Sequence, residues 1–229
     1  MNRPALPAPL AERARAFAAG GVPVVAPRPA STVALLRAGD GGLEVYVHVR
    51  HPGMAFAGGM LAFPGGRADP VDGADPGAAR WPPAVFVRAA IRETHEETGV
   101  LLTPGDLVPW AHWITPRFEE RRYDTWFYLA ALPAGQDTAD ISGEASEVGW
   151  VRPADAFERA GRGDVVMLPP TAVVLESLLP FATVAEALAA GDGRRIDTVI
   201  PGWLDDGAQV WGLLPGDPEY PGDDAGADA

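Results

Sequence analysis

The sequence contains neither cysteine nor lysine, and each absence excludes a class of site. Without cysteine the chain has no disulfide framework and no zinc–thiolate centre. Without lysine it cannot form the phosphate-cradling loop that ends in Gly-Lys-Ser/Thr. All 18 basic residues are arginines, and with 31 acidic residues they give a net charge of −13. This charge argues against a surface that coats nucleic-acid phosphates, so no nucleic-acid partner is expected.

Long apolar runs are missing as well. No uninterrupted apolar stretch reaches the ~20 residues that cross a bilayer. The N-terminus lacks the apolar core and small-residue cleavage site of a signal peptide. We therefore expect a cytoplasmic protein with no membrane partner. Leu10 to Ala19 predicts a helix whose Arg and Ala content is weakly similar to a transit peptide, and we interpret it as an accessory helix.

The sequence does contain enough apolar residues to form a hydrophobic core. At 229 residues and 47% apolar content, the chain fits one domain with additions, or two small domains. We divide it into an N-terminal accessory segment (1–28), a main domain (29–200) and an acidic Pro/Gly-rich tail (201–229). The tail is expected to be disordered at its end, because Asp, Gly and Pro dominate it.

Alternating and helical patterns predict an α/β fold. Leu43 to Arg50 alternates strictly, with apolar residues on one face and Glu44, Tyr46, His48 and Arg50 on the other. Further strands are expected at 33–37, 59–63, 107–114, 123–132 and 148–151, and helices at 84–98, 153–160, 172–179 and 184–190. Strands that flank a helix in this order suit a mixed sheet between helices.

Three glutamates mark the helix expected at 84–98. Glu93, Glu96 and Glu97 stand at i, i+3 and i+4, which places them on one helix face. Each close pair of like charges destabilises a helix by roughly 0.2–0.5 kcal/mol. Arg92 alone cannot balance three carboxylates, whereas a hard divalent cation such as Mg²⁺ or Mn²⁺ could. The alternative is a solvated acidic face.

The residues around the triplet favour a cation site. Gly99 is placed to end the helix in a left-handed conformation. Upstream, Ala62-Phe63-Pro64-Gly65-Gly66 is a strand end running into a loop whose glycines allow close backbone approach to a ligand. Together these segments resemble the signature of the Nudix hydrolase superfamily. The matching positions are Arg92, Glu93, Glu96, Glu97, Gly99 and Val100, with Thr94 in place of the usual aliphatic residue.

The first half of the signature departs from the family pattern. Ala84 stands where the family has a glutamate, eight residues before Arg92. The segment from 67 to 83 is longer than the family spacing, and its Gly, Pro and Asp content predicts an inserted loop. Within that loop, Asp69 and Asp72 are the candidates to replace the missing carboxylate.

The inserted loop also points to a branch of the superfamily. With Phe-Pro-Gly-Gly, Trp113–Pro116 and Arg122–Thr125, it resembles the branch around nucleoside diphosphate-linked moiety X motif 19, whose characterised members are described as coenzyme A diphosphatases. This resemblance implies a Nudix-type α/β/α sandwich with a mixed β-sheet and additional C-terminal helices. It implies a small-molecule nucleoside diphosphate derivative as substrate, with coenzyme A or acyl-CoA among the candidates. A homodimer stays open, and a catalytically silent binding or regulatory module is the alternative function.

The resemblance also suggests a role for each site residue. Glu93, Glu96 and Glu97 would bind Mg²⁺ or Mn²⁺, and a backbone group of Gly66 would complete the metal shell. Arg92 would support the carboxylates as a structural residue.

The resemblance implies a general base on a loop outside this signature, just ahead of the strand that carries Trp150. Glu144 is preferred, because it sits further into the loop, and Glu147 is the alternative. Glu119 and Glu120 are weaker contenders on a separate loop.

Other motifs and polar residues give weaker signals. His95-Glu96-Glu97 begins like a helical zinc-protease motif, but Gly99 occupies the position of the second histidine. The histidines, including His48, are interpreted as structural or surface residues. Four arginines are candidates for phosphate contacts or for solvated charges, namely Arg50, Arg117, Arg121 and Arg122.

Overall fold

The computed structural model describes residues 4–53, 58–75, 77–78, 80–143 and 145–220. The chain forms two compact units. A central unit comprises residues 29–111 and 126–196, and a terminal unit comprises residues 1–28, 112–125 and 197–229.

The central unit is built on a mixed β-sheet. Its strands pair in the order β8-β3-β2-β1-β6-β5, with β4 also pairing β1 and β7 also pairing β2. β1 and β2 form an antiparallel hairpin closed at Gly39 and Gly42, whereas β3 and β8 pair in parallel. The strands are β1 (Arg28–Gly39), β2 (Gly42–Arg50), β3 (Met60–Ala62), β4 (Gly65–Arg67), β5 (Val108–Ile114), β6 (Tyr123–Ala131), β7 (Ala145–Val151) and β8 (Val166–Met167).

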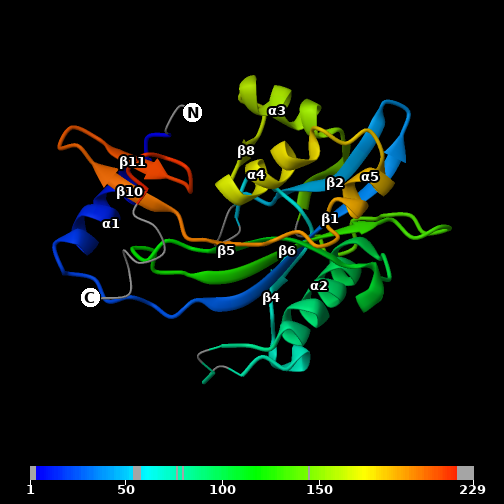
Figure 1. The fold of residues 1–229 in the computed structure, drawn as a ribbon, viewed down its shortest axis with the longest axis horizontal. Helices are drawn as coiled ribbons and strands as arrows, with labels where there is room; N and C mark the ends of the chain where they lie inside the picture. The colour runs from blue at the N-terminus through cyan, green and yellow to red at the C-terminus, as the bar shows by residue number, and fades with distance from the viewer. Residues whose placement is uncertain (1–3, 54–57, 76, 79, 144, 221–229) are drawn as a thin grey trace. The chain divides into compact units, whose positions relative to one another are not determined.

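Helices cover both faces of this sheet (Figure 1). Helix α2 (Pro83–Thr98) lies on one face, and α3 (Pro153–Gly161) and α4 (Pro169–Leu178) lie on the other. A fourth helix, α5 (Val184–Ala189), follows α4. Helix α2 begins at a proline, which suits the first helical turn, and ends at Gly99 with φ +76°. These observations confirm the predicted α/β fold.

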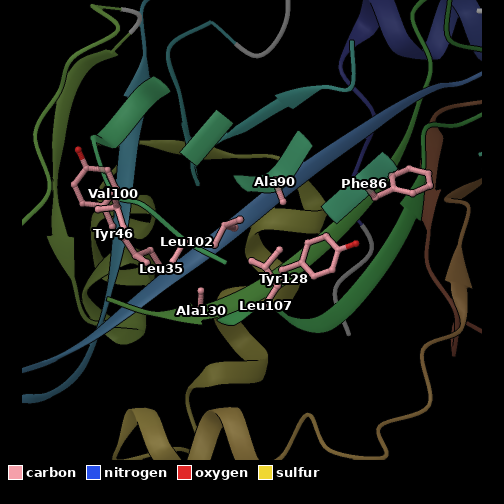
Figure 2. Packing of buried hydrophobic residues seen from close by; sticks show 10 residues of the cluster. Leu35, Tyr46, Phe86, Ala90, Val100, Leu102, Leu107, Tyr128 and Ala130 are labelled. Carbon is pink, nitrogen blue, oxygen red and sulfur yellow. The ribbon is translucent and has the colours of Figure 1, made fainter. Parts of the chain in front are cut away.

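The apolar face of α2 packs on the sheet to form the main core. Phe86 and Ala90 of the helix lie with Val33 and Leu35 of β1 and Tyr128 of β6 in one buried cluster, part of which Figure 2 shows. Val33 and Leu35 are fully buried, and burial of each such side chain contributes roughly 1.5–3 kcal/mol. This packing holds α2, and with it the glutamates, in a fixed position on the sheet.

The terminal unit brings together segments from both ends of the chain. Ala11 and Ala14 of α1 (Ala8–Ala18) pack with Phe118 and Val210. Trp203 stacks edge-on against Phe118 at a centroid distance of 5.2 Å. The other elements of the unit are β9 (Thr198–Val199), which pairs with the end of β5, and the antiparallel hairpin β10 (Gly202–Asp205) and β11 (Val210–Leu213).

Part of the segment expected as a Pro/Gly-rich tail is therefore an ordered hairpin. Asp206 and Gly207 lie in the turn between its strands, and an Asp-Gly pair between apolar runs is a common hairpin signal. Arg15 of α1 binds Asp205 at 2.9 Å, so the accessory helix and the hairpin are joined by charge as well as by apolar packing. The division at 1–28, 29–200 and 201–229 stays a prediction.

No helix in the part of the chain that the structure describes is long and apolar enough to cross a membrane.

Candidate active site

Helix α2 presents its three glutamates at different depths. Glu97 is 7% exposed, and its side chain lies against the β-sheet side of the helix. Glu93 is half-buried, whereas Glu96 is exposed. The helical spacing predicted from the sequence therefore places the three carboxylates on neighbouring positions, one turn apart or less.

Arg92 binds two of these carboxylates with one nitrogen. Its Nη1 lies 2.9 Å from Glu93 Oε1 and 2.9 Å from Glu96 Oε2. A single guanidinium thus neutralises part of the repulsion that the triplet creates. The supporting role of Arg92 stays a prediction.

The opposite edge of the same guanidinium meets the inserted loop. Arg92 Nη2 lies 2.7 Å from Asp72 Oδ2, and Asp72 is 3% exposed. Hydrogen bonding to Asp72 raises the pKa of Arg92 further above its usual value. Asp69 instead pairs with Arg67 at 2.7 Å on the surface. Of the two candidates for the missing carboxylate, Asp72 is the one that contacts the glutamate helix, while Ala84 is exposed.

A short 3-10 turn, Pro70–Asp72, docks this part of the loop on α2. The carboxylate of Asp72 accepts the backbone N–H of Asp69 at 2.9 Å, and the carbonyl of Asp72 accepts Arg88 Nε at 2.7 Å. Asp72 is therefore held through both its carboxylate and its backbone carbonyl, in addition to its contact with Arg92.

The glycine loop also contacts the glutamates of α2. Gly65 N donates to Glu97 Oε2 at 2.8 Å. A Cβ on Gly66 would lie 2.6 Å from the carboxyl carbon of Glu93, and a Cβ on Gly65 would lie 2.3 Å from the carbonyl oxygen of Ser31. Only glycine allows so close an approach. The structure thus brings Gly66 and Glu93 together, whereas a metal contact of Gly66 stays a prediction.

The surroundings of Glu93 favour a bound cation. Burial raises the pKa of Glu93, and the neighbouring charge of Arg92 opposes that rise. A carboxylate that burial disfavours is stabilised by any further positive charge placed beside it. Glycine at position 66 leaves room for this carboxylate, because a Cβ there would lie 2.6 Å from its carboxyl carbon.

The carboxylates are nevertheless not arranged as a finished metal cage. Within the described ranges, no three His, Cys, Asp or Glu side chains form a group that could hold a metal ion. Arg92 holds Glu93 and Glu96, and Gly65 holds Glu97. The donor set is all oxygen and suits a hard divalent cation, provided that Arg92 Nη1 gives up its carboxylates to that cation.

His48, which was interpreted from the sequence as structural or surface, is buried beside Glu97. It lies on β2 with Nδ1 4.0 Å from Glu97 Oε2 and is 5% exposed. Burial, assisted by the charge of Arg50, lowers the pKa of His48 to about 4, so the ring is neutral at pH 7. The alternation in β2 indicated that His48 shares a face of the strand with Tyr46 and Arg50, but it did not indicate that this face packs against α2.

The preferred general base, Glu144, lies outside the described residues. The loop before it is held on the end of α2, since Ala139 N donates to Thr98 O at 3.0 Å and Ile141 N to Glu97 O at 3.5 Å. Glu147 pairs with Arg159 of α3 at 2.8 Å.

Pairing of Glu147 with Val49 places it on the face of the sheet opposite to His48. Its carboxylate is therefore directed away from the glutamate helix. The weaker contenders, Glu119 and Glu120, belong to the terminal unit, where Glu119 binds Arg13 at 3.2 Å.

Among the arginines considered for phosphate binding, Arg122 has a structural role. Its guanidinium donates to the carbonyls of Thr115 at 3.0 Å and Val25 at 2.7 Å within the terminal unit. Arg50, at the end of β2, is close enough to influence the pKa of His48.

Comparison with known proteins decides the family. Residues 27–169 match the NUDIX domain. The chain belongs to the NUDIX domain family. This membership confirms the predicted family and, with it, the hydrolase class. NUDIX hydrolases generally use divalent metal ions, which agrees with the oxygen donors on α2.

Two curated NUDIX relatives are similar over part of their length. The chain is 28% identical over 189 residues to acyl-coenzyme A diphosphatase NUDT19 of Gallus gallus, covering 73% of this chain and 50% of that protein. It is 29% identical over 125 residues to the protein of the same name in Xenopus laevis, covering 51% of this chain and 33% of that protein. The chain therefore spans half or less of these relatives. Their names confirm the resemblance to the coenzyme A diphosphatase-like branch.

A solved NUDIX structure supports the fold. The crystal structure of a NUDIX hydrolase from Alicyclobacillus acidocaldarius superposes with a TM-score of 0.62 at 24% identity, over 71% of this chain and 96% of that one. The likeness confirms the NUDIX fold of the central sheet and helices.

Proposed function

We propose that this NUDIX protein is a divalent-metal-dependent hydrolase, with Mg²⁺ or Mn²⁺ as its ion. Its substrate would be a nucleoside diphosphate linked to another moiety, and the bond cleaved would be the diphosphate linkage. One observation carries the proposal. Three carboxylates are gathered near the C-terminal end of α2, where Gly65 binds Glu97 and Arg92, itself paired with Asp72, binds Glu93 and Glu96. The similarity to two acyl-coenzyme A diphosphatases supports coenzyme A or an acyl-CoA as the substrate.

The chain's own residues divide the work in this proposal. Glu97 and Glu93 are the principal metal ligands, with Glu96 as a third and a backbone group of Gly66 completing the shell. A bound divalent cation neutralises diphosphate oxygens and lowers the pKa of a bound water. Arg92, which is itself held by the inserted loop, pairs with Glu93 and Glu96 until the cation takes the place of its Nη1.

Glu144 is the residue we assign as the general base. It would take a proton from the attacking water as oxygen bonds to one phosphorus and the bridging P–O bond breaks. The products are two phosphate monoesters. The contacts of Ala139 and Ile141 with the end of α2 support this assignment, because they hold the preceding loop beside Glu97.

A binding or regulatory module that does not hydrolyse its ligand is the alternative. Arg92 already binds Glu93 and Glu96, so the helix is partly neutralised without a cation. The loss of the family glutamate at Ala84 favours the same reading. A module of this kind would bind a nucleotide and leave it intact.

A substrate panel separates the two functions. Purified protein is incubated with coenzyme A, acyl-CoA, NADH, ADP-ribose, nucleotide sugars and dinucleoside polyphosphates, with Mg²⁺, with Mn²⁺ or with EDTA, and products are separated by chromatography. The hydrolase account expects metal-dependent cleavage of at least one compound into two phosphate monoesters. Tight binding of one compound without cleavage under any metal condition would establish the alternative.

A further inference from the structure

Strand β2 carries an unusual concentration of unpaired polar atoms. Among the residues described, five buried side-chain nitrogen or oxygen atoms have no hydrogen-bond partner. Three of the five belong to this one strand, namely Tyr46 Oη, His48 Nε2 and Arg50 Nε. Native proteins leave few such atoms unpaired, because each lost hydrogen bond costs stability. A run of them on one strand therefore calls for a partner.

The three residues share one face of the strand. They occupy alternate positions, and alternate side chains of a strand point to the same side of the sheet. Tyr46 and His48 are 2% and 5% exposed, so both are nearly enclosed by protein. The opposite face of the strand is different in kind, since Val47 and Val49 line a separate cavity there.

This polar face looks toward the glutamate helix. Tyr46 packs in the cluster that contains Phe86 and Ala90 of α2. His48 Nδ1 lies 4.0 Å from Glu97 Oε2. The His48 ring therefore lies beside the carboxylate that Gly65 binds, and Tyr46 and Arg50 flank His48 on the same face of the strand.

The chemistry of the three groups defines what they would bind. The tyrosine hydroxyl and the arginine Nε each supply a donor, and the neutral imidazole of His48 supplies one more in the tautomer that carries its proton on Nε2. Arg50 also carries a full positive charge. A ligand that satisfies all three needs several oxygen acceptors and a negative charge within a small volume, which is the description of a phosphate group.

We propose that Tyr46, His48 and Arg50 form a recognition strip that binds the phosphate oxygens of the substrate beside Glu97. The strip deepens the function proposed above and rests on it. It assigns to β2, outside the glutamate helix and the glycine loop, the contacts that hold the diphosphate.

The test compares ligand affinity with stability. Binding of α,β-methylene-ADP, whose diphosphate cannot be cleaved at its bridge, is measured by titration calorimetry with Mg²⁺ and with EDTA. Tyr46→Phe and His48→Leu are the variants, and Tyr128→Phe is the matched control, because Tyr128 lies in the same buried cluster but on β6. Adenosine serves as the control ligand without phosphate. Thermal unfolding of each protein is recorded without ligand.

If the recognition strip binds phosphate, the two variants should bind α,β-methylene-ADP more weakly than the wild type without losing stability. Each of the two variants should raise Kd for α,β-methylene-ADP by roughly 10- to 100-fold, which is the effect of losing one hydrogen bond to a charged group. Their unfolding temperatures should be unchanged or higher, because an unpaired polar atom has been removed. Tyr128→Phe should bind the analogue as the wild type does, and adenosine affinity should not change in any variant.

Three results would overturn the inference. Wild-type Kd values in both variants would show that the strip is structural, and the hydrolase proposal would survive if the substrate panel gave cleavage. An equal loss of adenosine affinity would assign the strip to the nucleoside and not to phosphate. If the wild type did not bind the analogue at all, the recognition strip would not be a diphosphate site. The substrate panel would then test the proposed function independently of the strip.

Discussion

Asp72 and Arg92 bind each other across the junction between the inserted loop and helix α2, with 2.7 Å between Asp72 Oδ2 and Arg92 Nη2. The same guanidinium reaches Glu93 and Glu96 through its other terminal nitrogen. A residue of the loop that interrupts the family spacing thus positions the arginine that orients the glutamates. The loop is part of the site and not only an addition beside it.

Removing the charge of Asp72 should affect both folding and metal binding. Asp72→Asn leaves Arg92 without its buried anionic partner, so we expect the free energy of unfolding to fall by about 1–3 kcal/mol. The freed guanidinium would pair more strongly with Glu93 and Glu96 and compete with the cation. Mn²⁺ affinity should therefore drop by roughly three- to tenfold, which corresponds to about 1 kcal/mol of added competition.

Chemical denaturation and Mn²⁺ titration measure the two effects of Asp72→Asn. The matched control is Asp69→Asn in the same loop, whose carboxylate pairs with Arg67 at the surface. It should change the free energy of unfolding by no more than about 0.5 kcal/mol. Equal behaviour of the two variants would show that Asp72 has no special role.

A methyl group at position 66 should disturb the site more than the fold. In Gly66→Ala the new Cβ would meet the Glu93 carboxylate at 2.6 Å, so that carboxylate must move. We expect kcat to fall by roughly 10²-fold, the usual effect of a displacement near 1 Å in a catalytic group. Gly149→Ala is the control, because a Cβ there meets no atom within 4 Å. Steady-state kinetics that do not separate the two variants would contradict the close approach of residue 66 to Glu93.

The assignment of the general base predicts different pH profiles for two neighbouring glutamates. Glu144→Gln should lower kcat by roughly 10²- to 10⁴-fold with little change in substrate binding, and part of the rate should return at alkaline pH, where hydroxide replaces the base. Glu147→Gln should behave like the wild type, because this residue pairs with Arg159 on the other face of the sheet. The reverse pattern in the pH–rate profiles would move the base to Glu147.

The elements that carry strong periodic patterns could be predicted from sequence. Strict alternation over residues 43–50 and the spacing of the glutamates identified β2 and α2, because side chains on one face repeat every two residues in a strand and every three to four in a helix. Gly99 ended α2 as expected, since its φ of +76° suits glycine. The hairpin at 202–213 was missed, because Asp and Gly in its turn were interpreted with the composition of the whole tail.

Contacts between distant segments could not be predicted in the same way. The sequence offered Asp69 and Asp72 equally as replacements for the family glutamate, and only the fold shows which one reaches Arg92. His48 was recognised as a polar residue of β2, but a repeat of two residues does not reveal which neighbour lies above that face. Long-range placement of this kind depends on how the helix and sheet pack, which local patterns do not encode.

The central claim, that α2 supplies the ligands of a divalent cation, is tested most directly by Mn²⁺ binding to the metal-free protein, followed by electron paramagnetic resonance. Three proteins are compared, namely the wild type, Glu97→Gln and the control Glu176→Gln, which changes an exposed glutamate of α4. Because an amide is a weaker and uncharged ligand, Glu97→Gln should raise Kd for Mn²⁺ at least ~10-fold, whereas Glu176→Gln should match the wild type. Equal Mn²⁺ affinity in all three proteins would contradict the account, because the cation would then bind elsewhere or not be needed.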